Sequence, residues 1–135
     1  QQELKLLDNA LEKILTLTTD AFEFDDARTA SQVEPLEQVI DILVERLRAQ
    51  HIKRLKDGAC SIDTGVVYLD VLNNVERISD HCSNIAARLV GMEAGEDYDS
   101  HTLKNMMHHN PTKEYMLNYE QCRKDYLIPL EQLEA

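Results

Sequence analysis

Residues 71–89 read VLNNVERISDHCSNIAARL, and this stretch decides the fold. Its apolar side chains recur at alternating steps of four and three, at Val71, Val75, Ile78, Cys82, Ile85 and Leu89. Such steps place side chains on one face of an α-helix, and the regular alternation is typical of the seam of a helical bundle. The stretch therefore predicts a long helix, over about residues 62–91, that packs through this stripe.

The sequence on either side predicts further helices. Two precede this one, over about residues 3–23 and 26–57, and the second ends where Asp57-Gly58 supplies a glycine cap. Their apolar stripes are Leu4, Leu7, Leu11, Ile14, Thr18, Ala21 and Phe22, and then Val33, Leu36, Ile40, Leu43, Leu47 and Leu55. After a loop over 91–100, a short helix is expected over 101–108 and a last one over 112–134.

Pro35 allows two interpretations of the helix over 26–57. A proline kinks a helix that is already under way, because it removes a backbone hydrogen bond. It is tolerated in a first turn, and Ser31 with Glu34 forms a capping-box pattern that would begin the helix there. We favour the longer helix with a local kink. In the last helix, Pro129 is expected to cause a bend near the end.

Composition indicates the fold class. In 135 residues there are four glycines and three prolines, which leaves few places to turn a short strand. An all-α helical bundle is therefore expected, as one domain spanning residues 1–135. No apolar run approaches the length that spans a bilayer. The chain begins at Gln1, within the first helical pattern, so we expect it to be a piece of a larger protein.

The net charge of −11 argues against nucleic acid as a direct ligand, because its phosphates would be repelled. A cation, a basic partner or simple solubility fits this surface better. The three cysteines, Cys60, Cys82 and Cys122, form no CxxC pair. They are expected to be free thiols in a reducing compartment.

Two acidic pairs carry the candidate chemistry: Glu37 with Asp41, and Glu76 with Asp80. Residues four apart lie on one helix face, where two carboxylates repel each other. Arg77, another basic side chain or a bound cation would offset this repulsion. Hard cations bind through several carboxylate oxygens, so two facing pairs would make a reasonable metal site.

The heights of the two pairs support a shared site. If the second and third helices form an antiparallel hairpin, both pairs are equidistant from a midpoint between residues 58 and 59. Asp41 then meets Glu76, and Glu37 meets Asp80. The alternative is a plain solvated surface, since the chain has 25 acids and such pairs are common in Glu-rich helices. Spacing alone leaves both interpretations open.

Polar neighbours and missing motifs narrow the chemistry. The residues that would support the four carboxylates are Asn73, Arg77, His81 and Asn84. The chain has no GxxxxGK loop, no GxSxG elbow and no Glu-x-x-His pair. Their absence argues against a phosphate-binding loop, an α/β-hydrolase and a di-iron oxidase. Each absence argues against one class of enzyme, and we expect a protein that is not an enzyme.

Residues 72–86, LNNVERISDHCSNIA, are similar to the signature of the PhoU family, N-x-x-E-R-I-x-D-H-x-x-N-I. Residues 33–43, VEPLEQVIDIL, resemble that family's other acidic motif, which holds Glu37 and Asp41. Residues 108–126, HHNPTKEYMLNYEQCRKDY, resemble the tail of PhoU-like domains attached to sodium–phosphate cotransporters. The resemblance covers about residues 1–130.

This resemblance implies an antiparallel up-down three-helix bundle, here with an additional C-terminal helical segment. It implies a divalent or ferric metal ion held by Glu37, Asp41, Glu76 and Asp80. It also implies a regulator that restrains phosphate uptake by contacting a transporter. Family members usually hold two bundles in tandem, and one bundle fits a domain fused to the C-terminal, cytosolic side of a Na+/phosphate cotransporter. A metal cluster between repeats cannot form inside one such chain, and homo-oligomerisation stays open.

Two other classes of function compete with this regulator. One is a metal-dependent enzyme with His81 as its base, which a substrate-sized pocket beside Glu76 and Asp80 would favour. The other is an interaction or scaffold bundle without metal. Basic side chains that fill the space between the two acidic motifs would favour that second alternative.

Overall fold

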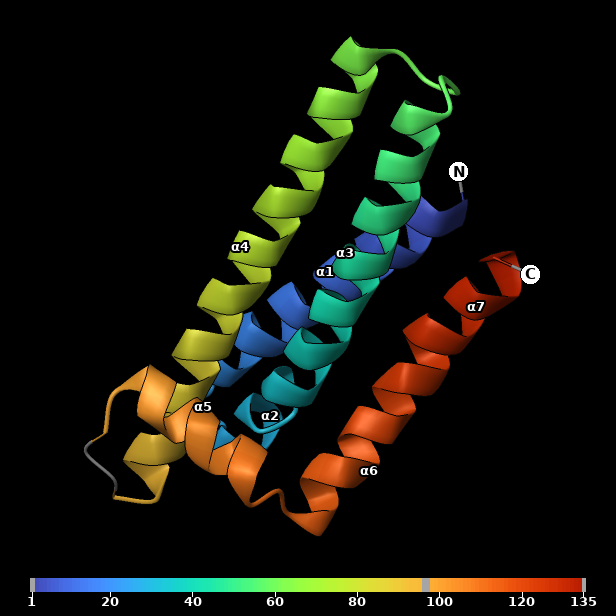
Figure 1. Cartoon of the computed structure of the whole chain (residues 1–135). Helices are drawn as coiled ribbons and strands as arrows, with labels where there is room; N and C mark the ends of the chain where they lie inside the picture. The colour runs from blue at the N-terminus through green and yellow to red at the C-terminus, as the bar shows by residue number, and fades with distance from the viewer. Residues whose placement is uncertain (1, 96–97, 135) are drawn as a thin grey trace.

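The computed structural model describes residues 2–95 and 98–134, and the regular structure of these residues is entirely helical (Figure 1). The long helices are α1 (Gln2–Glu23), α3 (Val33–Lys56) and α4 (Ile62–Glu93), and two short ones are α2 (Ala27–Ala30) and α5 (Ser100–His109). The chain ends in α6 (Lys113–Cys122), the π-helical segment η1 (Arg123–Leu127) and α7 (Ile128–Glu134). The predicted all-α class is confirmed.

Helices α1, α3 and α4 form the up-down bundle that the sequence indicated. Helices α1 and α4 run in the same direction, α3 runs in the opposite direction, and each of the three contacts the other two (Figure 1). The segment from α6 to α7 continues as one rod that packs against α3 and α1. Helix α5 crosses the end of α4 that lies far from the α3–α4 turn (Figure 1).

Local chemistry explains where these helices begin and end. The Asp26 side chain accepts hydrogen bonds from the backbone N–H groups of Arg28 and Thr29, and so caps α2. Ser61 caps α4 in the same way through the N–H of Thr64. Gly58, with φ of 71°, terminates α3 in the left-handed conformation that glycine adopts most readily.

Pro35 and Pro129 affect the helix backbone in different ways. Pro35 is the third residue of α3, and Ser31 and Gln32 separate α3 from α2. The favoured prediction of one helix kinked at Pro35 is therefore wrong, because a first-turn proline gives up no intrahelical bond. Just before Pro129, where a bend was predicted, the helix widens into the π-helical turn η1, in which the Ile128 N–H donates to the Arg123 carbonyl. The wider turn relieves the clash that a proline ring makes with the preceding turn.

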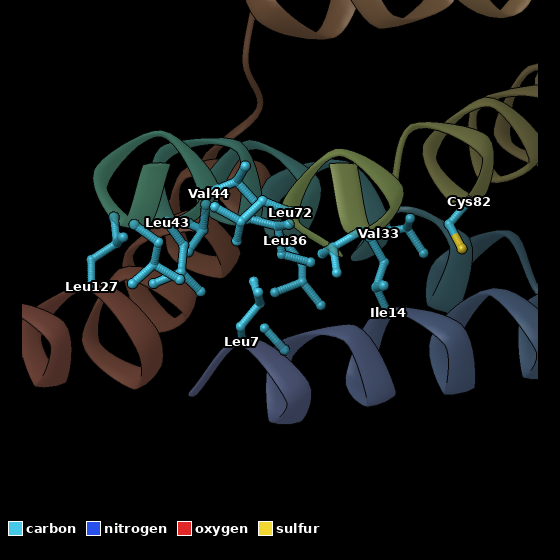
Figure 2. Packing of buried hydrophobic residues seen from close by; sticks show 14 of the residues in the cluster. Leu7, Ile14, Val33, Leu36, Leu43, Val44, Leu72, Cys82 and Leu127 are labelled. Atoms are coloured by element: carbon cyan, nitrogen blue, oxygen red, sulfur yellow. The ribbon is translucent and has the colours of Figure 1, made fainter. Parts of the chain in front are cut away.

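Helix α3 supplies the centre of the core. Five of its six predicted stripe residues, Val33, Leu36, Ile40, Leu43 and Leu47, are buried, and the sixth, Leu55, is partly exposed. Figure 2 shows Val33, Leu36 and Leu43 within this packing. On α1, Leu7, Ile14 and Ala21 are buried, but Phe22 is 70% exposed and its assignment to the stripe is wrong. Adjacent helical residues point about 100° apart, so Ala21 and Phe22 cannot both face the core.

The predicted stripe of α4 is rotated. Val71, Ile78 and Ile85 are 44%, 37% and 44% exposed, so their placement in the seam is wrong. The buried residues of α4 are Gly65, Leu72, Val75, Ser79, Cys82, Ser83, Ala86, Ala87 and Gly91. Small side chains dominate this face, and they let α1 and α3 approach α4 closely. Close packing of these small side chains therefore favours this face over one that would bury Val71, Ile78 and Ile85.

Gly91 lies inside α4, not at its end. The predicted end at residue 91 is wrong, since α4 continues to Glu93. A Cβ atom on Gly91 would lie only 2.7 Å from Cδ1 of Leu103, which shows that the glycine allows α5 to approach. Of the predicted loop over 91–100, Glu96 and Asp97 lie outside the described residues.

The three cysteines are free, as predicted. Cys82 is buried, and burial raises the pKa of its thiol. Burial raises the pKa of Cys122 to about 11. Among the described residues, no helix combines the length and the hydropathy needed to cross a bilayer.

Candidate functional site

The α3–α4 hairpin brings the four predicted acids into one region. We call Glu37, Asp41, Glu76 and Asp80 the acidic cluster. Asp41 of α3 lies within electrostatic reach of both Glu76 and Asp80 of α4. The hairpin register is the expected one, because Ser83 donates a hydrogen bond to Glu34, and these two residues are equidistant from the midpoint between 58 and 59.

Burial, with repulsion among the acids, disfavours the charged forms of Glu37 and Asp41. Glu37 is buried, and desolvation, together with the charges of Glu34 and Asp41, raises its pKa to about 9. Desolvation also raises the pKa of Asp41, against the lowering effect of its hydrogen bond with Glu37, and the charges of Glu76 and Asp80 add to the increase. At neutral pH, Glu37 therefore holds a proton in the folded state.

Lys104 of α5 is the cation nearest to the cluster. Its Nζ lies 3.1 Å from Oδ1 of Asp80 and 3.4 Å from Oδ1 of Asn84. The lysine side chain is only 13% exposed. Desolvation lowers its pKa, but the charge of Glu34 and the hydrogen bond to Asp80 outweigh this effect and raise it. The ammonium group is therefore charged throughout the physiological range.

A second base approaches the other end of the cluster. Arg48 of α3 donates to Oδ1 of Asn73 at 2.9 Å and lies 3.5 Å from Oε1 of Glu76. It also pairs with Glu45. Both ion pairs are partly exposed, since Glu76 is 39% and Asp80 is 55% exposed, so each contributes little to stability.

Glu34 adjoins the cluster at the beginning of α3. Its carboxyl is buried and accepts a hydrogen bond from Ser83 of α4. The Nε2 atom of His108, on α5, lies 2.7 Å from its other oxygen. One turn along α3, Gln38 accepts a 2.6 Å hydrogen bond from the Tyr115 hydroxyl of α6. Helices α5 and α6 thus close over the first turns of α3.

The residues predicted to support the four acids divide into two groups. Asn73 and Asn84 lie beside the cluster and accept hydrogen bonds from Arg48 and Lys104. Arg77 and His81 are exposed on α4, and each is directly adjacent in sequence to an acid that faces the cluster. Adjacent helical positions diverge by about 100°, so the two side chains point elsewhere.

Sequence reasoning missed the bases that approach the acids. Lys104 and Arg48 were not singled out, nor were Glu34 and Ser83 as a buried pair. One sequence feature could have indicated that α5 supplies polar contacts: Lys104 and His108 lie one helical turn apart, on one face of the predicted short helix. Which element that face contacts is a tertiary property.

The side-chain oxygen atoms at the acidic cluster are of the chemical type that hard cations bind. Carboxylate oxygens with the amide oxygens of Asn73 and Asn84 are typical ligands of such an ion. In the described part of the chain, however, no three His, Cys, Asp or Glu side chains converge on one point. The Lys104 ammonium contacts Asp80 instead. An ion at the four acids would therefore require a rearrangement of carboxylates and of Lys104.

Comparison with known proteins identifies the family. The PhoU domain matches residues 4–89, which include both acidic motifs. The chain is 25% identical over 96 residues to the phosphate-specific transport system accessory protein PhoU homolog 1 of Thermotoga maritima, covering 71% of this chain and 41% of that protein. It is 34% identical over 79 residues to the PhoU homologs of two Streptococcus pneumoniae strains, covering 58% of this chain and 37% of each relative. It therefore spans about two fifths of the length of these curated relatives, and no solved structure matches it significantly. The match over residues 4–89 covers more than half of the chain, which thus belongs to the PhoU domain family.

Proposed function

We propose that this chain is a regulatory domain of a phosphate transport system and is not itself an enzyme. The family match over residues 4–89 carries the proposal. The relatives named above are accessory proteins of phosphate-specific transport systems, and the same role is proposed here by similarity. By the same similarity, the domain would restrain phosphate uptake through contact with a transporter.

The transporter is proposed to be a Na+/phosphate cotransporter whose transmembrane part belongs to the same parent chain. The resemblance of residues 108–126 to the tail of cotransporter-attached domains supports this. The domain would then lie on the cytoplasmic side of the cell membrane. The gene sequence upstream of Gln1 tests the proposal: it should encode several apolar helices, and a second PhoU bundle there would contradict it.

The acidic cluster is proposed to bind a divalent or ferric cation through Glu37, Asp41, Glu76 and Asp80. The meeting of carboxylates from the facing helices α3 and α4, with Asp41 in electrostatic reach of Glu76 and Asp80, supports this proposal. A cation would neutralise carboxylates of α3 and α4 together, and so link ion status to the shape of the hairpin. Metal analysis of the purified protein, beside the variant E37Q/D41N/E76Q/D80N, tests it. Equal and negligible metal in both proteins would overturn the cation site.

The alternative, a scaffold bundle without metal, differs from this proposal in whether the acidic cluster holds a cation. A scaffold bundle is expected to have basic side chains between its acidic motifs, and Lys104 and Arg48 are such residues. The family match applies equally to both alternatives, so metal analysis separates them. An enzyme would be favoured by a substrate-sized pocket beside Glu76 and Asp80. The cavity beside α5 is lined by Leu103, Met106 and Tyr115 among others, and neither acid belongs to its lining.

Phosphate uptake tests the regulatory role itself. In phosphate-replete cells that lack the gene, uptake of radiolabelled phosphate should rise, and re-expression of the wild-type protein should restore it. The four-fold amide variant, if it folds by circular dichroism, should not restore it. Unchanged uptake after the gene is deleted would overturn the role in phosphate transport, whatever the metal analysis shows.

A further inference from the structure

Helix α4 leaves an apolar side uncovered where it adjoins α1. Its Ser83 contacts α3, and its Cys82 lies beside Thr18 of α1. Ile78 and Ile85 lie further around α4 in the same sense, past the contact with α1 and away from α3. Both are exposed, at 37% and 44%. This side of α4 therefore faces solvent next to α1.

Helix α1 contributes the other half of an uncovered surface. Its Leu15 and Phe22 lie three positions before and four positions after Thr18, so they share the side of α1 that meets α4. Both are exposed. The rod from α6 to α7 packs elsewhere, against α3 and the other side of α1. We define the α1–α4 face by its exposed apolar side chains, Leu15, Phe22, Val71, Ile78 and Ile85.

The two helices of this face lie in a defined register. The Tyr68 hydroxyl of α4 donates a hydrogen bond to Glu3 of α1, which lies 65 positions earlier in the sequence. Because α1 and α4 run in the same direction, each residue of α1 lies level with the one about 65 positions later (Figure 1). Three pairs of opposite charge have this separation: Lys5 with Asp70, Glu12 with Arg77, and Glu23 with Arg88.

These charged side chains lie at the two edges of the α1–α4 face. On α1, each directly follows an apolar residue, and on α4 two of the three directly precede Val71 and Ile78. Adjacent positions diverge by about 100°, which turns the charges toward the outer edge of each helix. Among the described residues, none of the six takes part in an ion pair. The two edges thus carry complementary charges at matched heights that a single chain leaves unpaired.

We propose that the α1–α4 face docks a second copy of this chain, related to the first by a two-fold axis parallel to the helices. Such an axis leaves heights unchanged and places α1 of each copy on α4 of the other. The apolar side chains then meet at the centre, and each of the three charge pairs forms twice at the edges. This contact goes beyond the proposed regulatory role and does not depend on the cation site.

The size and charge of the molecule set the expected strength of this contact. Two helices of about 20 residues, each about 10 Å wide, present roughly 600 Å², near the about 800 Å² per partner of a standard interface. Each copy carries a net charge of −11, so the copies repel each other at long range. We therefore expect a weak dimer, with a dissociation constant of about 10–100 µM. The monomer then predominates at low micromolar concentration.

Sedimentation equilibrium of the full chain tests the contact. At about 500 µM, the wild type should approach twice the monomer mass of 15.5 kDa, and at about 1 µM it should sediment as the monomer. Ile78→Glu places a charge at the centre of the face and should raise the dissociation constant at least about tenfold. Leu117→Glu is the matched control, because Leu117 is an exposed apolar residue of α6, and it should dimerise as the wild type does.

Charge reversal tests the arrangement of the two copies. Glu12→Arg and Arg77→Glu should each weaken the dimer about tenfold, because two like-charged contacts replace two ion pairs. An equimolar mixture of these two variants should dimerise as the wild type does, since each reversed charge then meets an opposite charge in the other copy. Circular dichroism confirms that each variant folds, and the charge variants keep the test decisive if Ile78→Glu does not fold.

Three results would overturn the proposal. A wild type that is monomeric at 500 µM would leave the α1–α4 face to a partner of another kind. A dimer that neither Ile78→Glu nor charge reversal weakens would form through a different surface. Weakening in both charge variants without recovery in their mixture would contradict the two-fold arrangement. None of these results bears on the role in phosphate transport, which the uptake experiment decides separately.

Discussion

The two flanks of α4 contrast in polarity and in contact. The polar flank carries Asn73, Glu76, Asp80 and Asn84, and bases from α3 and α5 contact it. The apolar flank carries Val71, Ile78 and Ile85, which are largely exposed. Between the flanks lies the buried face, which includes two serines. On this helix, the position of neighbouring elements, and not the polarity of a side chain, decides what is covered.

The difference also shows where stability resides. The buried face contributes through close packing, whereas the polar flank contributes through charge balance, which depends on pH and on bound ions. The apolar flank contributes little to the stability of the isolated chain. Four substitutions, two on α4 and two at the acids that face it, test this division.

The largest effect is expected for Leu72→Ala, on the buried face. Leu72 is fully buried in the core, and its truncation should lower the free energy of unfolding by about 2–5 kcal/mol. Urea unfolding followed by circular dichroism measures this value. A loss below about 1 kcal/mol would show that the buried face is not the one described.

The next largest effect is expected for Glu34→Ala, beside the polar flank. Loss of this buried carboxyl leaves the Ser83 hydroxyl without its acceptor and removes the contact with His108. The free energy of unfolding should fall by about 2–3 kcal/mol in the same urea assay. Glu45→Ala is the matched control, since Glu45 is exposed and its ion pair with Arg48 lies at the helix surface. Equal losses in the two variants would contradict the role given to burial.

A smaller, pH-dependent effect is expected for Glu37→Gln. The pKa of Glu37 is raised from 4.5 to about 9, so the folded state binds this proton more tightly than the unfolded chain does. The resulting stability is complete below about pH 4.5 and is lost as the pH rises through about 9. The glutamine has no proton to lose. Its stability relative to the wild type should therefore increase by about 1–3 kcal/mol between pH 5 and pH 9. Parallel stability curves for the two proteins would contradict the raised pKa.

The smallest effect is expected for Val71→Ala, on the apolar flank. Val71 is 44% exposed, and alanine has the higher helix propensity, so stability should change by less than about 0.5 kcal/mol. The comparison with Leu72→Ala is direct because the two positions are adjacent in sequence. A loss as large as that of Leu72→Ala would mean that the apolar flank is covered in solution.

Much of the fold could be predicted from the sequence. The stripe of α3, the cap at Ser61 and the turn at Gly58 follow from local periodicity and backbone preference. The register of the hairpin followed from sequence distance to that turn, since the rise per residue of a helix is constant. The four acids of the cluster could be chosen for the same reason.

The remaining features depend on fit between elements. The face of α4 was misassigned because Val71, Ile78 and Ile85 are more hydrophobic than Ser79 and Ser83, and hydrophobic spacing cannot register how closely helices approach. Lys104 was missed because its role depends on where α5 docks. That docking depends in turn on the space left by Gly91.

The sequence by itself determined that the chain is helical, where most helices begin and end, and that two acidic pairs stand at matched heights on a hairpin. These properties arise from hydrogen bonds and spacing within a few residues of the chain. Only the tertiary structure decided which face of α4 is buried and which cation approaches the acids. Both depend on packing and charge between segments far apart in sequence, where shape complementarity and desolvation outweigh the preference of any single residue.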